Sequence, residues 1–201
     1  MIWFTSDWHL FHVNILKYQS NRGVWSLEGM QELLTENYNI RVQTDDTVYF
    51  LGDVVMGHKI INIPLSIPFL NGHKHLILGN HDGGFENNDE SDKFKLKTQF
   101  YLDNGFESVS RHSSLSPNLR LSHFPWRGVP DRENGREDLQ KYALDDDGVS
   151  ILLHGHSHQP EKVSGVRSIH VGVDAWDMKP VSMDQVADLI LENGWNAPNT
   201  P

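Results

Sequence analysis

Apolar positions in this chain form short runs, and each run ends abruptly at polar residues. The clearest run covers residues 75–78 and stops at Gly79, after which Asn80, His81 and Asp82 follow. A run this short and this apolar is typical of a central strand that is covered on both faces. Because ligands of α/β sheets bind at strand ends, we expect the polar residues after this run to lie in a functional site.

The same pattern occurs four more times along the chain. The other runs are residues 2–6 before Asp7 and His9, 48–51 before Asp53, 119–122 before His123, and 151–153 before His156 and His158. Asp, Asn and His side chains bind transition metals through oxygen and nitrogen. Any single element has an ordinary explanation as a turn or a core histidine. The full set of five has no economical structural explanation, and it predicts a metal site.

The remaining pattern predicts strands that alternate with helices. Helices are expected over residues 14–20, 26–42, 91–103 and 183–192, and further strands over residues 106–110 and 168–173, with the second strand covering residues 47–51. Residues 56–70 predict an irregular segment or a short helix before Pro64, because Pro64 and Pro68 interrupt a regular helix. Residues 124–148 form a long polar stretch, and such loops are uncommon unless they are functional or disordered. The alternation indicates an α/β fold.

Composition limits the classes of function. With 201 residues, 38% of them hydrophobic, the chain is long enough to bury a core as one domain over residues 1–195, and residues 196–201 are expected to fray. A net charge of −10 argues against extended nucleic-acid binding through a broad basic surface. The chain has no cysteine and no run long enough to span a membrane. A cleaved signal peptide would remove Asp7 and His9, so we expect a cytoplasmic protein.

The motifs in their order resemble those of the calcineurin-like metallophosphoesterase superfamily. They are Asp-x-His, Gly-Asp, Gly-Asn-His-Asp, a later His and Gly-His-Ser-His, and they extend from Asp7 to His158. The resemblance implies two facing mixed β-sheets flanked by helices, with a dinuclear metal site at the strand ends.

The resemblance also implies a role for each motif residue. One ion would be held by Asp7, His9, Asp53 and His158, and a second by Asp53, Asn80, His123 and His156. Asp53 would bridge the two ions. Asn80 and His81 are the expected catalytic residues, and His81 matches the residue that contacts the scissile phosphate and protonates the leaving oxygen.

Simple electrostatics supports phosphate chemistry at such a site. Two divalent ions bring four positive charges, whereas Asp7 and Asp53 are the only anionic ligands, so about two positive charges remain for a phosphate. Two such ions also acidify a bridging water, which becomes the nucleophile for in-line attack. Nitrogen and oxygen ligands suit manganese, iron, zinc or nickel.

The sequence around the bridging position departs from one branch of the family. Phosphoprotein phosphatases have a second Asp and an Arg after their Gly-Asp motif, whereas this chain has Met56 and no Arg there. It is more similar to small single-domain phosphodiesterases of bacterial and phage type. We therefore expect a phosphodiesterase that acts on small phosphorylated substrates, above all nucleotide diesters that include cyclic ones. The alternatives are a phosphomonoesterase, a dinucleotide pyrophosphohydrolase, or a non-catalytic scaffold, and seven competent ligands argue against the scaffold.

Three arginines in residues 124–148 are candidates for substrate binding. Arg127 lies four residues after His123, and its guanidinium could hold a phosphate with two hydrogen bonds. A surface role for Arg127 is equally open. Arg132 and Arg136 are expected to face solvent.

Overall fold

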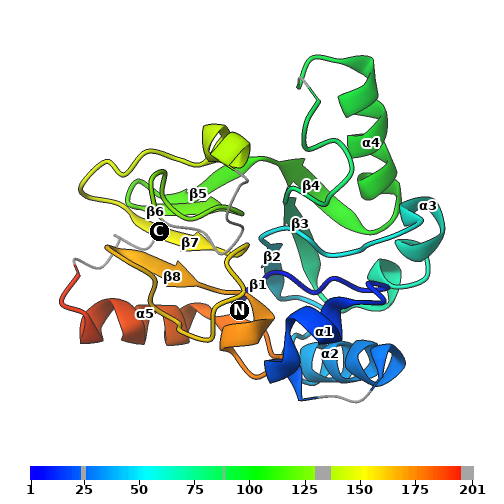
Figure 1. The fold of residues 1–201 in the computed structure, drawn as a ribbon, viewed down its shortest axis with the longest axis horizontal. Helices are drawn as coiled ribbons and strands as arrows, with labels where there is room; N and C mark the ends of the chain where they lie inside the picture. The colour runs from blue at the N-terminus through cyan, green and yellow to red at the C-terminus, as the bar shows by residue number, and fades with distance from the viewer. Residues whose placement is uncertain (24–25, 88, 130–136, 196–201) are drawn as a thin grey trace.

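The strands of the computed structural model form two sheets, and the model describes residues 1–23, 26–87, 89–129 and 137–195 (Figure 1). The first sheet has the order β4-β3-β2-β1-β9. Its strands are β1 Ile2–Thr5, β2 Thr47–Phe50, β3 His73–Ile77, β4 Phe106–Ser110 and β9 Val181–Ser182. Strands β1 to β4 are parallel, and β9 pairs antiparallel with β1.

The second sheet has the order β5-β6-β7-β8. Its strands are β5 His112–Ser116, β6 Leu119–Ser122, β7 Ile151–His154 and β8 Ser168–His170. Strand β5 is antiparallel to β6, and the other pairs are parallel. Both sheets are therefore mixed, which confirms the predicted α/β class and its two mixed sheets.

Helices join the parallel strands of the first sheet, as parallel pairs require a crossover connection. The α-helices are α1 Ile15–Tyr18, α2 Leu27–Arg41, α3 Lys59–Asn62, α4 Asp92–Asp103 and α5 Met183–Glu192. Short 3₁₀ helices are η1 Ser20–Arg22, η2 Ile67–Phe69, η3 Glu137–Tyr142 and η4 Val173–Ala175. Helix α2 begins after Ser26, whose side chain accepts a hydrogen bond from the Gly29 amide. The short α3 before Pro64 confirms the prediction for residues 56–70.

Two apolar clusters cover the two faces of the first sheet. The cluster between the sheets includes Phe4, Ile77, Leu121, Leu153 and Ile169, all at most 1% exposed, together with Val186 and Ile190 of α5. The cluster on the helical side includes Trp8, Met30, Leu34, Tyr38 and Phe50. Figure 1 shows α1 to α4 beside the first sheet, and α5, which packs against β9 and β1, at the lower edge of the molecule. The sheets therefore face each other across a dry core, and their strand ends meet at one edge.

Some elements of the structure differ from those predicted from the hydrophobic pattern of the sequence. Strand β8 ends at His170, three residues before the predicted end, because the chain turns at Gly172 into η4. Strands β5 and β9 were not predicted, since β5 is polar and β9 has two residues. Within residues 124–148, η3 buries Leu139, so this stretch has structure of its own. Arg132, Arg136 and the tail 196–201 lie outside the described residues, and the single domain over residues 1–195 stays a prediction.

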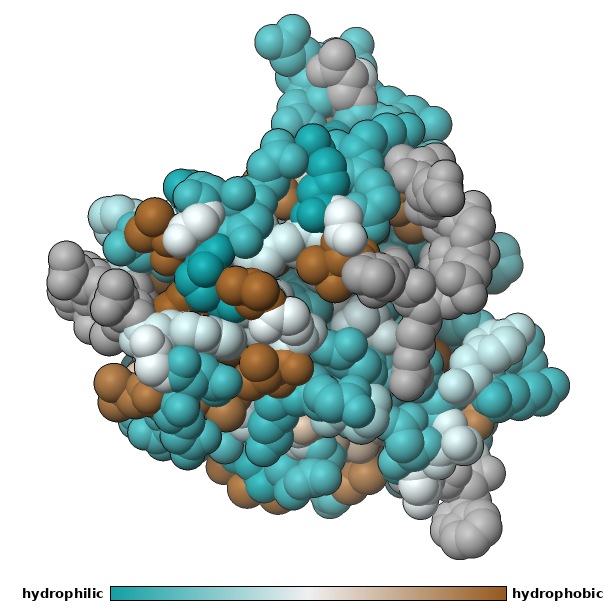
Figure 2. Space-filling view, turned by 60° about the vertical axis from the view of Figure 1, so that its left-hand side comes forward, coloured by the Kyte–Doolittle hydropathy of each residue, from teal (hydrophilic) through white to brown (hydrophobic). Residues whose placement is uncertain are grey.

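None of the helices in the described ranges has the length and apolar character needed to cross a bilayer. On the face drawn in Figure 2, apolar residues lie in small groups among polar ones.

The start of α5 provides a test of the fold. The Ser182 hydroxyl accepts a hydrogen bond from the Gln185 amide, and the Gln185 side chain accepts one from the Ser182 amide at 2.9 Å. Ser182→Ala should lower the free energy of unfolding by about 1 kcal/mol, which shifts Tm by about 2–4 °C in a domain of this size. Ser182→Thr keeps the hydroxyl and serves as the control. Thermal unfolding with no difference between the two variants would contradict the cap.

Candidate metal centre

The loops after five strands converge between the two sheets. The Asp7 amide donates to the Gly52 carbonyl at 3.0 Å, which joins the loops after β1 and β2. The Gly155 amide donates to the His123 carbonyl at 3.0 Å, which joins the loops after β7 and β6. A further bridge pairs Ser6 with Gly172 and connects the two sheets. The predicted convergence of strand ends is thus present.

The first group of candidate ligands contains Asp7, His9 and His158. Their ligand atoms all lie within 4.8 Å of one another. The Nε2 atoms of His9 and His158 face each other at 3.1 Å, and His158 Nε2 lies 3.9 Å from Asp7 Oδ1. Two histidine nitrogens that both bind one ion at about 2.0–2.1 Å come within a similar distance. This group can hold one cation.

The second group contains Asp7, Asp53 and His123, again within 4.8 Å. Asn80 adds its Oδ1, which lies 3.0 Å from His123 Nε2. The ring of His156 is centred 5.1 Å from the ring of His123. The structure thus places all four residues of the predicted second set on this side, with Asp7 beside them.

Asp53 belongs to the second group and also approaches the first, while Asp7 is a member of both. The Oδ2 of Asp53 is 3.7 Å from His9 Nε2 and 3.5 Å from His123 Nε2. One carboxylate oxygen therefore approaches a histidine from each group, as a bridging ligand must. The donor set fits divalent transition metals, because it consists of carboxylate, amide and imidazole groups, all of them buried except Asn80 and His158, which are partly buried.

Five of the seven candidate ligands have left-handed backbone conformations. Their φ angles are 60° for Asp7, 49° for His9, 55° for Asp53, 68° for His156 and 49° for His158. Non-glycine residues rarely adopt this region, and such strain clusters at functional sites when the surroundings enforce it. Four other described residues, Phe11, Arg167, Asp177 and Met178, share this conformation, so the strain is concentrated at the candidate ligands without being confined to them.

Two glycines let the backbone approach the carboxylates. A Cβ atom on Gly79 would collide with Asp53 Oδ1, and a Cβ on Gly155 would collide with the Ser6 hydroxyl and lie 2.5 Å from Asp7 Oδ2. Any larger residue at either position would displace a candidate ligand. The glycines of the Gly-Asn-His-Asp and Gly-His-Ser-His motifs are thus required by close packing.

The buried charges shift the pKa values of the ligands. Burial lowers the pKa of His9 well below its ordinary value, so this imidazole is neutral and its lone pair is available to a cation. Burial also opposes the charge on His123, but the Asp53 carboxylate outweighs it and raises the pKa of His123 to about 10. A cation at this position would therefore replace a proton on His123.

Asp82 supports the site, although the sequence assigned it no role. Its buried Oδ2 accepts hydrogen bonds from the amides of Gly79 and Asp53, both at 2.8 Å. Burial, together with the nearby charge of Asp53, raises the pKa of Asp82 to about 6. Asp82 thereby ties the ligand loops after β2 and β3 together. The sequence feature that could have identified Asp82 is its position directly after His81 in the Gly-Asn-His-Asp motif.

Asp174 and Arg22 were also missed. Asp174 Oδ2 lies 2.7 Å from His158 Nδ1, and Arg22 pairs with the same carboxylate. No local motif surrounds either residue, so no sequence signal could have found them.

His81 occupies a different environment from the ligands. It is half-buried, its amide donates to Asp53 Oδ1 at 2.9 Å, and its ring is centred 5.6 Å from the ring of His9. Within the described part of the chain, the His81 ring has no hydrogen-bond partner. The ring is therefore available to a substrate bound at the metal centre.

Arg127 is engaged by its own loop. Its guanidinium donates to the carbonyls of Gln140 and Ala143 and lies 3.0 Å from an Asp145 oxygen. These contacts occupy N–H groups of the Arg127 guanidinium, and a role of Arg127 in phosphate binding stays a prediction.

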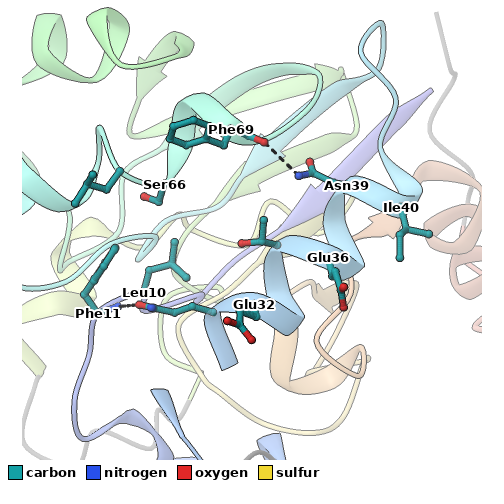
Figure 3. A pocket seen from close by; sticks show the side chains of 11 residues that line it. Leu10, Phe11, Glu32, Glu36, Asn39, Ile40, Ser66 and Phe69 are labelled. Atoms are coloured by element: carbon teal, nitrogen blue, oxygen red, sulfur yellow. Dashed lines mark hydrogen bonds between the residues drawn. The ribbon is translucent and has the colours of Figure 1, made fainter. Parts of the chain in front are cut away.

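A separate groove of about 710 Å³ lies between α2 and residues 65–69 (Figure 3). Phe11, two residues after His9, lies at one end of the groove, where its amide donates to the Gln31 side chain at 2.7 Å. The described lining residues are apolar, neutral or acidic and include no histidine, lysine or arginine. The groove therefore lacks groups for phosphate, and the chemistry belongs to the metal centre.

Comparison with known proteins agrees with this site. Residues 1–160 match the model of the calcineurin-like phosphoesterase family. The chain is 35% identical to the Gene 66 protein of Mycobacterium phage L5, covering 94% of this chain and 93% of the relative. It is 30% identical to an uncharacterised protein of Methanocaldococcus jannaschii, covering 94% and 90%.

A solved structure shows the same fold. The crystal structure of a protein of unknown function from Aquifex aeolicus superimposes with a TM-score of 0.69 at 23% identity, covering 94% of this chain and 99% of that one. Because residues 1–160 match the family model, the chain belongs to the calcineurin-like phosphoesterase family and is a metal-dependent phosphoester hydrolase.

Proposed function

We propose that this protein is a dinuclear metal-dependent phosphodiesterase that acts on small nucleotide-type diesters, including cyclic ones. The observation that carries the proposal is the placement of Asp53 Oδ2 between a histidine of each ligand group, at 3.7 and 3.5 Å. One ion would be held by Asp7, His9, Asp53 and His158. The other would be held by Asp53, Asn80, His123 and His156, with manganese, iron, zinc or nickel as the candidates.

The metals, His81 and the buried ligands would have different roles in catalysis. Two bound divalent ions would neutralise charge on the phosphoryl oxygens and acidify the attacking water. His81 is placed beside His9 with an unengaged ring, so it can contact a phosphoryl oxygen or donate a proton to the leaving oxygen. Buried ligands exclude bulk water from the inner side of the centre.

The charges around the centre favour a diester. A bridging hydroxide would lower the surplus of about two positive charges to about one, which matches a monoanionic diester, whereas a monoester is a dianion near neutral pH and is bound better where a further cation is present. Arg22 is buried and paired with Asp174, and Arg127 is held by its own loop. The position of the phosphatase Asp is taken by Met56. A monoanionic diester therefore suits these described surroundings better than a dianion.

The substrate is expected to be small. A net charge of −10 opposes a long polyanion, so a nucleotide would be held locally by the metal centre. No membrane partner is expected, and a cytoplasmic location stays a prediction.

The bridging role of Asp53 can be tested by metal content. Asp53→Ala should lose at least one of two divalent ions and nearly all activity, because one carboxylate serves both positions. Elemental analysis after dialysis measures the loss, and Asp188→Ala on the exposed face of α5 is the control. Two retained ions with full activity in Asp53→Ala would contradict the assignment.

The preference for diesters can be tested with matched substrates. We expect a higher kcat/KM for bis(p-nitrophenyl) phosphate than for p-nitrophenyl phosphate, because Arg22 and Arg127, the arginines considered above among the described residues, are already paired. The protein is stripped of metal and reloaded with one kind of ion at a time, which identifies the preferred metal in the same assay. A clear preference for the monoester would instead support the phosphomonoesterase alternative.

The role of His81 can be separated from metal binding. His81→Ala should keep both ions and lose about a hundredfold to ten-thousandfold in kcat for a diester with an alkoxide leaving group. With p-nitrophenolate the loss should shrink, because this leaving group departs as a stable anion. His73→Ala, at an exposed position of β3, is the control.

Two results would revise the role of His81. Equal losses for both leaving groups would replace proton donation with electrostatic binding of the phosphoryl oxygens. Loss of an ion from His81→Ala would make His81 part of the metal centre.

A further inference from the structure

A buried ion pair lies directly behind one candidate ligand. Arg22 Nε is 2.9 Å from Asp174 Oδ1, and both side chains are fully buried. Arg22 comes from η1 and Asp174 from η4, so the pair joins segments 152 residues apart. A second nitrogen of Arg22 donates to Asp174 Oδ2 at 3.0 Å, which makes the pair bidentate.

The pair contacts the metal centre on both sides. Asp174 Oδ2 lies 2.7 Å from His158 Nδ1. The Arg22 guanidinium donates to the carbonyl of Asp7 at 2.6 Å and to that of Trp8 at 3.0 Å. Arg22 and Asp174 therefore fix the backbone of one candidate ligand and the ring of another.

The contact also determines which nitrogen of His158 carries a proton. Arg22 donates one hydrogen bond to each oxygen of the Asp174 carboxylate, at 2.9 and 3.0 Å, so this side chain is an ionised acceptor. An ionised carboxylate only accepts hydrogen bonds, so His158 Nδ1 must be the donor. Nε2 then faces His9 Nε2 at 3.1 Å, where a ligand atom is needed.

Stability alone does not explain such a pair. Removing two charges from water costs free energy that a buried ion pair recovers only partly, and an apolar pair of the same volume is often as stable. A carboxylate that orients a metal-binding histidine is, in contrast, a recurring way to fix its tautomer and ring.

We propose that Asp174, held by Arg22, is a positioning residue that fixes His158 with Nε2 directed at the metal position shared with Asp7 and His9. The inference rests on the proposed metal centre for its effect on binding. Its effect on the tautomer of His158 holds for the protein without metal.

The first test measures metal binding rather than turnover. Calorimetric titration of metal-stripped protein with Mn²⁺ should show two sites in the wild type. Asp174→Asn keeps the size of the side chain but removes its charge, and it should weaken one site by about tenfold to a hundredfold and leave the other unchanged. Asp146→Asn, which breaks the surface pair with Arg167, is the matched control and should change neither site.

The second test observes the His158 ring in the wild-type protein. Long-range ¹H–¹⁵N spectra of metal-free wild-type protein should show His158 with a proton on Nδ1. The signal of this proton is assigned by its loss in His158→Gln.

Circular dichroism and thermal unfolding check that Asp174→Asn is folded. If it is not, the double variant Arg22→Met/Asp174→Asn removes the unpaired charge and is titrated in its place.

The outcomes distinguish the alternatives. Equal weakening of both sites, or no weakening, would overturn the positioning role, as would a His158 ring that lacks the Nδ1 proton. A wild type that binds no Mn²⁺ would overturn the proposed metal centre, while the spectra would still decide the tautomer of His158.

Discussion

Two carboxylates, those of Asp7 and Asp53, are buried almost completely between the sheets, and the rest of the site depends on this burial. A buried charge is tolerated only when it is paired or hydrogen-bonded. Asp7 accepts hydrogen bonds from the His156 amide at 3.0 and 3.1 Å, and Asp53 accepts one from the His81 amide at 2.9 Å. Each carboxylate therefore fixes the loop that carries another functional residue, so the loops are ordered together.

The sequence revealed the positions of the ligands because of a property of parallel strands. Their carboxyl ends meet at one edge, so polar residues after β1, β2 and β3 had to converge, and the same holds for β6 and β7. Asp82 was visible in the motif, but its bonds to two amides depend on tertiary structure. Arg22 and Asp174 interact across 152 residues, and no local pattern encodes such a pair. Strand β5 was not predicted because its residues are mostly polar. Strand β9 was not predicted because only its pairing with β1 identifies it as a strand.

The candidate metal ligands and His81, the candidate proton donor, lie in different environments. The candidate ligands other than Asn80 and His158 are buried, and their polar atoms face one another. His81 is half-buried and follows Asn80 directly, so the same turn places the Asn80 amide oxygen 3.0 Å from His123 Nε2 and the His81 ring beside the ring of His9. Adjacent residues of one motif therefore reach different parts of the candidate site.

The backbone strain at the candidate ligands is a cost that the rest of the fold has to sustain. Five left-handed ligands, at about 1 kcal/mol or more each, represent a cost of about 5 kcal/mol, although Asp and His tolerate this region better than most residues. That cost is a large share of the roughly 5–15 kcal/mol that stabilises a typical protein. It is sustained only if the two sheets, the buried carboxylates and the ion pair of Arg22 with Asp174 hold the loops in place. The stability of this fold is thus partly spent on keeping the ligands in position.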